Sequence, residues 1–264
     1  GLDQPILIQY TKWLQELLQG NLGYSFTNRQ PVTERIGDRI MPTLTLAFSA
    51  LLLSYIIAVP IGVLSAVRQY SKLDYAATIF AFLGVSIPSF FFGLLMIYIF
   101  ALKLDLFPTG GMQTIGANFS ILDRLHHLVL PTIVLSLQNT GIVMRYTRSS
   151  MLEVIHQDYV RTAKSKGISG RAVMVGHALR NALIPLITLA GLQFPFLLGG
   201  AIITEQIFNW PGMGRLTVEA INQRDYPTIM GLNLMIAILV IIGNLAADVM
   251  YGVVDPRIRT SEYS

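Results

Sequence analysis

The stretch from Ser150 to Pro185 carries the densest set of side chains that could make specific polar contacts. It reads SMLEVIHQDYVRTAKSKGISGRAVMVGHALRNALIP, which is too polar to cross a membrane but has the composition of a helix. Asp158, Arg161 and Ser165 recur at helical spacing, and Gly167–Gly170 interrupts the pattern. The sequence predicts a helix–turn–helix whose mixed surface suits docking of another protein. A DNA-binding hairpin and a solvated basic loop are the alternatives.

Groups that could supply energy or covalent chemistry are scarce. The sequence contains no G-x-x-x-x-G-K-[ST] phosphate loop and no cysteine, which excludes ATP binding of that type and thiol chemistry in these residues. Ion-coupled transporters keep acidic side chains near the middle of the membrane. Here Glu205 and Asp248 stand only at the ends of apolar runs, which disfavours an ion-coupled transporter and leaves it as an alternative.

Isolated polar side chains also stand within apolar runs. Gln138, Asn139 and Gln193 are candidates for lining a transport pathway, although amides in membrane helices commonly bond across helices instead. The pair His126–His127 could bind a metal or cap a helix. The segment Glu205–Trp210 could form a gate, but a tryptophan anchored at the membrane interface is the simpler interpretation.

The composition indicates the class of protein that must position these groups. Of 264 residues, 53% are hydrophobic and 13% are charged, and the mean hydropathy is +0.56. Soluble domains carry about 25% charged residues. So few charges predict an all-α membrane protein, and the net charge of +4 then reflects basic loops rather than nucleic-acid binding.

Five segments free of charged residues and histidine are long enough, or nearly so, to span a bilayer, which needs about 20 apolar residues. They are Thr43–Val67, Tyr75–Leu102, Leu128–Met144, Asn181–Thr204 and Tyr226–Ala247. The third is short, and we expect Arg145 and Arg148 to reach toward the interface at its end. Kinks near Pro88 and Pro195 are candidates for shaping a pathway.

The distribution of basic residues predicts the orientation of the chain. With five alternating spans, the short loop Arg68–Asp74 and the loop Arg145–Arg180 lie on one side, and both are strongly basic. The positive-inside rule places this side and the C-terminal tail in the cytoplasm, and residues 1–42 outside. Residues 1–42 read as amphipathic pieces with no signal peptide, so we expect a further transmembrane helix upstream.

The polar loop and several flanking motifs together resemble the permease subunits of peptide-type ABC importers. Asp158–Ala163 with Lys166–Gly167, and His177–Pro185, fit the DYVRTAxxKG and HALRNALxP forms of the cytoplasmic EAA loop in that family, where Ala163 and Gly167 keep the general motif. Further similar stretches are GLDQP at 1–5, VPIGVLSA at 59–66, SIPSFFFG at 86–93, GGAIITEQIFNWPGMGRL at 199–216, RDYP at 224–227 and DPRIR at 255–259.

The resemblance implies a type I ABC-importer permease fold with five visible transmembrane helices and a first helix missing upstream. It implies a bacterial or archaeal inner-membrane location and three kinds of partner: a second homologous permease, two cytoplasmic ATPases that bind ATP and magnesium, and an extracytoplasmic substrate-binding protein. No cofactor is expected in this chain. The permease domain then covers residues 43–254, with the coupling loop at 150–184 and a tail at 255–264.

The resemblance also implies the residues that couple the permease to an ATPase. The coupling helix is expected at Gln157–Lys166, ended by a turn at Gly167. Asp158, Arg161 and Lys164 would make polar contacts to the ATPase, with Thr162 beside them, and Tyr159 or Ala163 would pack into its groove. Short peptides are the expected substrate, with nickel or glutathione as alternatives.

Overall fold

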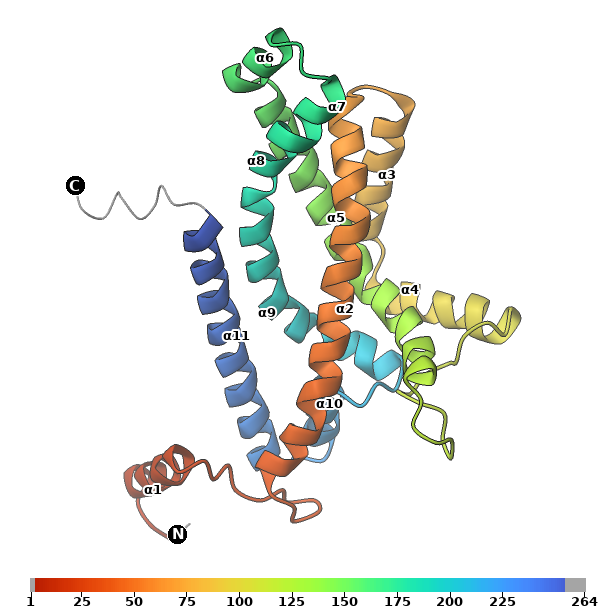
Figure 1. The fold of residues 1–264 in the computed structure, drawn as a ribbon. Helices are drawn as coiled ribbons and strands as arrows, with labels where there is room; N and C mark the ends of the chain where they lie inside the picture. Colours follow the sequence, from red (N-terminus) through yellow and green to blue (C-terminus); the bar gives the residue numbers. More distant parts are fainter. Residues whose placement is uncertain (1–2, 255–264) are drawn as a thin grey trace, which may run out of the picture.

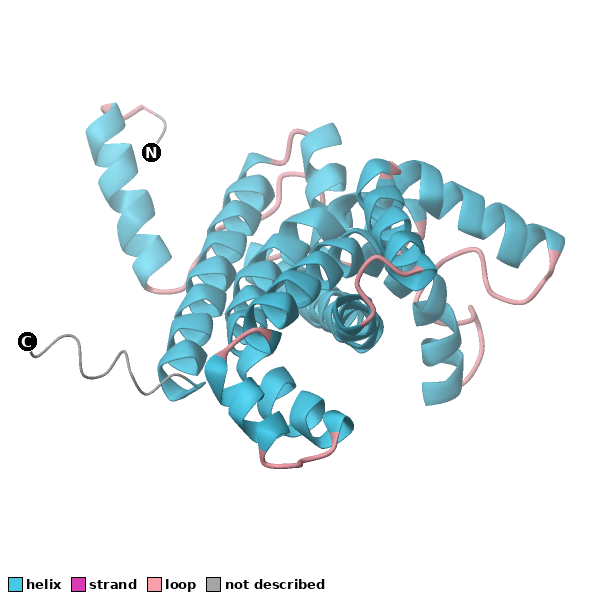
Figure 2. Ribbon diagram, turned by 90° about the horizontal axis from the view of Figure 1, so that it is seen from above, coloured by secondary structure: helices cyan, strands magenta, loops and turns pink. Residues whose placement is uncertain are grey.

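The computed structural model describes residues 3–254, and the expected tail at 255–264 lies outside them. Within that range the side chains of these residues are not described: Lys164, Arg171, His177, 194–196, 198–200, 248 and 250–254. The described chain is helical, and its β-type pairing is one isolated bridge between Tyr24 and Pro31 (Figure 2). The expectation of an all-α fold is confirmed.

Most of the helical elements are joined by short connections, and longer segments lie at 19–31 and 104–120 (Figure 1). Their bounds are α1 Ile6–Leu18, α2 Val32–Val67, α3 Lys72–Ser86, α4 Ser89–Met96, the π-helix η1 Ile97–Lys103, α5 Ile121–Ile155, α6 Asp158–Ser165, α7 Gly170–Val173, the π-helix η2 Met174–Leu179, α8 Arg180–Ala182, α9 Ile184–Ile207, α10 Met213–Asn222 and α11 Tyr226–Val254.

Helix α5 is the centre of the bundle. It packs against α2, α3, α4 and α9, while α11 packs chiefly on α9. One core cluster joins α2, α5 and α9 through Leu46, Leu135 and Leu197, together with Trp210. Because protein surrounds the middle of α5, this helix tolerates more polar side chains than a lipid-exposed span.

The spans agree with the sequence in number but not in shape. Three helices of the described chain are long and apolar enough to cross a membrane, and the number rises to five if each of two bent helix pairs is one span. The first span was expected from Thr43, but α2 already begins at Val32 and continues through Pro42. The amphipathic piece expected before the span is therefore the first part of α2.

The expected span Tyr75–Leu102, with a kink near Pro88, is a bent helix pair in which α3 and the α4–η1 segment meet at 101°. Proline disfavours helical dihedral angles in the residue before it and has no N–H to donate. Ile87, which precedes Pro88, accordingly has an extended conformation with φ −76° and ψ 123°, and α3 ends at Ser86. Helix α4 then runs sideways from the bundle (Figure 1).

Close approach of α2 and α5 depends on Gly62. A Cβ atom at this position would lie 2.7 Å from Cβ of Thr147 and 2.8 Å from the backbone oxygen of Met144. Small residues at helix crossings let membrane helices pack closely, because no burial of apolar surface from water drives their association. The α2–α5 crossing therefore excludes any larger residue at position 62.

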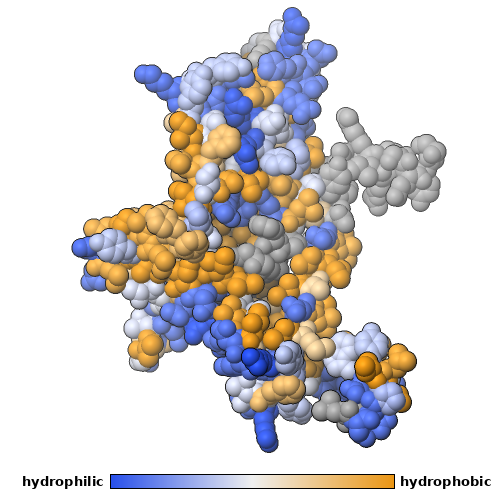
Figure 3. Space-filling view, turned by 180° about the vertical axis from the view of Figure 1, so that it is seen from behind, coloured by the Kyte–Doolittle hydropathy of each residue, from blue (hydrophilic) through white to orange (hydrophobic). Residues whose placement is uncertain are grey.

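The two ends of the bundle are polar and its middle is apolar. Figure 1 shows the α2–α3 connection at the same end as α6 and α7, and α1 and α10 at the opposite end. In Figure 3 apolar side chains gather across the middle of the molecule, with hydrophilic ones toward both ends. The expectation that Arg68–Asp74 and the polar loop share one side is confirmed.

A buried polar cluster fastens the N-terminal segment to the start of α11. The carboxylate of Asp225 is inaccessible to solvent and accepts hydrogen bonds from the Ser25 hydroxyl, the Phe26 N–H at 3.0 Å and the Thr228 hydroxyl at 2.8 Å. The Arg35 guanidinium lies 2.8 Å from it. Burial raises the pKa of Asp225, but these hydrogen bonds outweigh burial and hold the pKa below its usual 3.8.

Replacing Asp225 with asparagine is expected to lower the melting temperature at neutral pH. A carboxyl group with a lowered folded-state pKa contributes stability above its unfolded-state pKa and loses it as pH falls through the folded-state value. The difference in melting temperature between the natural protein and Asp225→Asn should therefore be constant above about pH 5 and shrink below pH 3.8. A difference independent of pH down to the lowest value at which the protein stays folded would contradict this role.

Candidate functional site

Helix α6 packs on the end of α5 through a small hydrophobic cluster. Val160 is fully buried and Ala163 is 7% exposed, and they belong to one cluster with Met151 of α5 and Ala66 of α2. Residues of α7, η2 and α8 complete this cluster. The helix expected at Gln157–Lys166 is confirmed as Asp158–Ser165, and its core predicts that it moves together with α5.

The turn expected at Gly167 is present. Gly167 has φ +75°, and the N–H of Ile168 donates to the carbonyl of Ala163 at 3.4 Å, the bond that closes a Schellman motif after a helix. An L residue in this left-handed conformation is strained. A Cβ at Gly167 would have nothing within 4 Å, so backbone conformation rather than space requires glycine.

The outer face of α6 is polar and accessible. Asp158, Arg161 and Thr162 are exposed, and Tyr159 is 40% exposed. The Tyr159 hydroxyl accepts a hydrogen bond from Nδ2 of Asn181 at 2.8 Å, which holds its ring against the start of the next span. These four residues form a surface that a partner protein can contact, and their role in coupling stays a prediction.

Two of the residues expected to contact an ATPase, Ala163 and Lys164, are not among these four. The interpretation of Ala163 as a group that packs into a partner's groove is wrong, because its methyl group is already buried against Val173 and Ala178 of the loop itself. The side chain of Lys164 lies outside the described residues. Alanine at position 163 is explained by the internal packing, where a larger side chain would displace α6 from its seat.

A buried ion pair holds the base of the loop, and no sequence pattern indicates it. Nε and Nη2 of Arg148 on α5 lie 2.7 and 2.9 Å from the two carboxylate oxygens of Asp74 on α3. The same carboxylate accepts the Ser65 hydroxyl of α2 and the Tyr70 N–H at 2.9 Å. Asp74 is 3% exposed. Its contacts with Arg148 and Ser65 join α3, α5 and α2 to one another, two residues before the loop at 150–184.

The three amides proposed for a pathway do not face a common space. In a permease that pairs with another, residues lining a pathway between subunits are expected on the surface of each subunit. Gln138 is exposed, but Asn139 and Gln193 are 3% and 7% exposed inside the bundle. The Tyr55 hydroxyl of α2 donates to Oε1 of Gln193 at 3.5 Å, a contact across helices of the kind given as the alternative, and a role of the three amides in a pathway stays a prediction.

Glu205 and Trp210 form a buried junction rather than an interfacial anchor. Trp210 is 1% exposed, and its Nε1 donates to the carbonyl of Pro42 at 2.9 Å. Glu205 is fully buried and accepts the Thr43 hydroxyl at 2.6 Å and the Arg215 N–H at 3.0 Å. The Thr43 hydroxyl in turn accepts the Met213 N–H at 2.8 Å. The carboxylate thereby caps the N-terminus of α10, where Gly212 has no side chain to do so.

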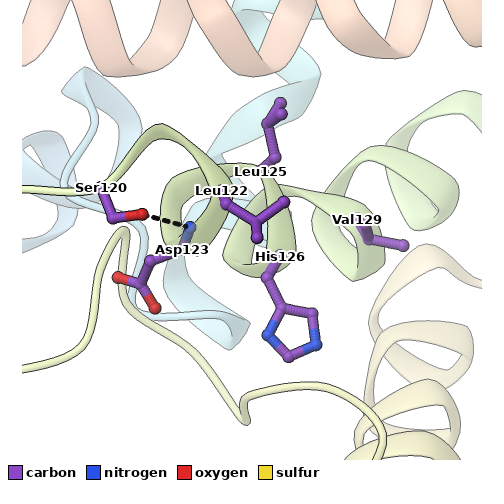
Figure 4. Close-up of a pocket in the computed structure, with 6 residues that line it drawn as sticks. All are labelled: Ser120, Leu122, Asp123, Leu125, His126 and Val129. Atoms are coloured by element: carbon purple, nitrogen blue, oxygen red, sulfur yellow. Dashed lines mark hydrogen bonds between the residues drawn. The ribbon is translucent and has the colours of Figure 1, made fainter.

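The histidine pair is structural in this arrangement. A ring nitrogen of His126 lies 2.7 Å from the carbonyl oxygen of Leu106, and one of His127 lies 3.2 Å from that of Gly110, so both fasten the preceding loop to α5. The described residues contain no group of three or more side chains suited to a metal. A neighbouring hollow of about 620 Å³ is lined by Leu122, Leu125 and Val129 and by the polar residues Ser120, Asp123 and His126; the Ser120 hydroxyl accepts the N–H of Asp123 (Figure 4).

Comparison with known proteins identifies similar chains of one kind. The family described as "Binding-protein-dependent transport system inner membrane component" matches residues 58–260. The oligopeptide transport system permease protein AppB of Bacillus subtilis is 48% identical over 260 residues, which cover 98% of this chain and 82% of AppB. The glutathione transport system permease protein GsiC of Salmonella paratyphi A is 40% identical over 259 residues, covering 98% and 81%.

Further similarity extends to the dipeptide transport system permease protein DppB of Escherichia coli, which is 39% identical over 280 residues, covering 98% of this chain and 83% of DppB. Among solved structures, the MetNI methionine ABC transporter in an inward-facing conformation matches with a TM-score of 0.69 at 17% identity, covering 83% of this chain and 96% of that chain. An amino acid ABC transporter matches with a TM-score of 0.59 at 15% identity, covering 85% and 94%. At these identities the solved structures show a shared fold.

Proposed function

The chain belongs to the family of inner membrane components of binding-protein-dependent transport systems, and we propose that it carries short peptides as one permease subunit of an ATP-driven importer. It is a transport component with the type I ABC-transporter permease fold. The observation that carries the proposal is the similarity to peptide permeases over almost the whole chain.

The proposed partners supply ATP binding, the other half of the pathway and substrate delivery. The sequence of this chain has no phosphate loop, so two cytoplasmic ATPases bind ATP and magnesium and supply the energy. A second, homologous permease supplies the other half of the pathway, and an extracytoplasmic binding protein delivers substrate. Only 11% of the most apolar stretch of α11 is buried inside the described chain. Its outward apolar face can therefore contact lipid or the second permease.

The exposed face of α6 is the surface that receives the ATPase. Asp158, Arg161 and Thr162 supply polar contacts, and the half-exposed Tyr159 ring supplies an apolar one. Because the opposite face of α6 is buried against α5 and α2, a movement imposed on α6 by ATPase closure displaces these helices as a body. The pathway between the two permeases then changes its side of access.

The end of the bundle that carries α6 and α7 lies in the cytoplasm. Basic residues concentrate in the two loops at this end, 68–74 and 145–180, and the positive-inside rule places such loops in the cytoplasm. Helices α1 and α10 then lie outside, as does the N-terminal segment. Accessibility of engineered cysteines to a membrane-impermeant reagent in intact cells measures this orientation.

Short peptides are the first candidate substrate, and glutathione is the second. Relatives named for oligopeptide and dipeptide transport support the former, and a relative named for glutathione transport, 40% identical, supports the latter. The choice between them rests with the binding protein, which selects the substrate before it reaches the membrane. Nickel has no such support among these relatives.

The experiment that tests the function is purification of the tagged protein from its native membrane, followed by uptake into liposomes. We expect a second permease and phosphate-loop ATPases to copurify, and labelled tri- to pentapeptides to enter only with ATP and the binding protein. Recovery of the protein alone, with uptake driven by an ion gradient, would overturn the proposal. ATP-dependent uptake of glutathione without peptides would replace the substrate only.

Substitution of Gly167 by valine is expected to uncouple ATP hydrolysis from uptake while the protein still inserts. A left-handed conformation costs an L residue about 1–2 kcal/mol, which lowers the ratio of correctly folded to unfolded loop roughly five- to thirtyfold. Gly176→Val is the matched control, because Gly176 lies in η2 with open space around it and no positive φ. Equal uptake by both variants and the natural protein would count against α6 as the coupling helix.

A further inference from the structure

Helix α1 has a continuous apolar face that the bundle does not cover. Ile6, Tyr10, Trp13 and Leu17 recur at helical spacing on one side, and Lys12 lies on the opposite side. None of the residues of α1 is buried, and Ile6 is 83% exposed. Figures 1 and 2 show α1 set apart from the other helices, connected to α2 by a loop.

The apolar face of α1 forms one wall of a groove, and α11 forms the other. The groove has a volume of about 820 Å³ and runs between Ile6, Tyr10 and Trp13 on one side and Tyr226 and Met230 on the other. Leu17, Phe26 and Leu234 extend these walls. Both walls are therefore mainly apolar, and their side chains would be exposed if water filled the groove.

The groove lies where a membrane-spanning helix begins. The apolar run of α11 starts at Tyr226, and most of its surface faces outward, so its first turns mark the edge of the hydrocarbon. Exposed tyrosine and tryptophan are typical of that boundary, because their rings are apolar and their N–H or O–H groups are polar. Tyr10 and Trp13, with ring centroids 5.9 Å apart, lie at the same end of the bundle as Tyr226.

We propose that α1 is an interfacial membrane helix, whose apolar face lies between the headgroups and acyl chains of the leaflet farther from α6 and α7. Acyl chains of that leaflet fill the groove between α1 and α11. Continuity of the groove with the membrane-facing surface of α11 favours lipid as the occupant. Lys12 is the one basic residue of α1, and Glu16, which lines the groove beside Leu17 and accepts a hydrogen bond from Nδ2 of Asn21 at 2.7 Å, offsets its charge. Apolar insertion rather than attraction to anionic lipid therefore holds the helix.

This proposal rests on the location of the chain in a membrane and not on the transported substrate. The first experiment places the full-length protein, with its copurified partners, in phosphatidylcholine nanodiscs. Subtracting the fluorescence of a Trp13→Phe variant isolates the emission of Trp13 from that of the buried Trp210. We expect blue-shifted emission that lipids brominated near the headgroup quench more strongly than lipids brominated near the chain ends.

A second experiment compares the two faces of α1, using the absence of cysteine from the 264 residues. Nitroxide labels at Tyr10→Cys and Lys12→Cys lie about 200° apart around the helix. We expect the first label to collide mainly with apolar oxygen and the second mainly with a water-soluble nickel chelate. Because Tyr10 faces the groove and Lys12 does not, each label is the matched control of the other.

Three outcomes would overturn the proposal. Strong quenching of Trp13 by aqueous iodide without quenching by bromine would place α1 in water. Absence of quenching by either agent would mean that protein covers α1, from a partner subunit or the binding protein. Equal nickel accessibility at positions 10 and 12 would exclude a one-sided contact. Transport of peptides could persist in each case, so these results are separate from the test of function.

Discussion

Replacing Arg148 with methionine is expected to lower the free energy of unfolding by about 3 kcal/mol, the lower end of the cost of removing one partner from a buried ion pair. The variant leaves the Asp74 carboxylate 3% exposed without its cationic partner, while the Ser65 and Tyr70 hydrogen bonds remain. The lower end applies because the Arg148 side chain is 29% exposed, so water already screens the pair in part.

Loss of the Arg148 pair should also reduce transport beyond the loss of folded protein. Arg148 lies two residues before the loop that carries α6, and its contact with α3 fixes the direction in which α5 enters that loop. We therefore expect fewer peptides imported per ATP hydrolysed, measured on equal amounts of folded transporter in liposomes. Arg148→Lys should restore part of the stability, because it keeps the charge but cannot make both hydrogen bonds.

Arg145→Met is the matched control for this prediction. Arg145 lies on the same helix three residues earlier, is exposed, and stacks over the Phe82 ring at 5.5 Å, with no carboxylate partner among the described residues. An exposed contact of this kind contributes about 0.5–1 kcal/mol. If Arg145→Met and Arg148→Met lowered stability and coupling equally, the ion pair would have no special role.

Replacing Glu205 with alanine is expected to have the largest effect on folding. The buried carboxylate is the acceptor for the Thr43 hydroxyl and for the Arg215 and Gly214 N–H groups. Each buried donor left without an acceptor costs about 1–3 kcal/mol, so three such donors predict a loss of about 3 kcal/mol or more. Folded yield in detergent and the melting temperature of what remains measure this loss.

Two further variants separate capping of α10 from simple loss of volume. Glu205→Gln has nearly the same size but directs an NH₂ group toward donors, so we expect it to remain well below the natural protein in stability. Glu219→Ala removes an acidic side chain from α10 itself, where Glu219 makes a surface ion pair with Arg215 at 2.9 Å. Such a pair contributes about 0–1 kcal/mol. A Glu205→Gln variant as stable as the natural protein would contradict the capping role.

Local features of the fold could be predicted because their causes are local. A helical stretch broken at Gly167–Gly170 follows from residue types within one short stretch, and the bounds Gln157–Lys166 that the resemblance implied agree with α6 to within a residue. The apolar runs likewise identified the spans. The bend at Pro88 was expected only as a kink, since a proline shows where a helix is interrupted but not the angle at which the chain continues.

The contacts that organise the site could not be predicted, because they join distant residues in helices of uniform polarity. Asp74 and Arg148 are 74 positions apart, and no pattern near either residue indicates the other. Asn139 and Gln193 remained candidates both for a pathway and for bonding across helices, because a helix that is apolar on all sides gives no periodic signal for its inner face. In a membrane the outer face is as apolar as the core, so burial of these amides depends on packing alone.

Helix α5 also sets a mechanical property of the protein. Its 35 residues form one uninterrupted element, from the loop pinned by the two histidines to the base of α6. At 1.5 Å per residue it is a rod about 52 Å long. A tilt of about 10° about one end displaces the other by roughly 9 Å. A small rotation imposed on α5 at the end that carries α6 would therefore displace its opposite end by several ångströms.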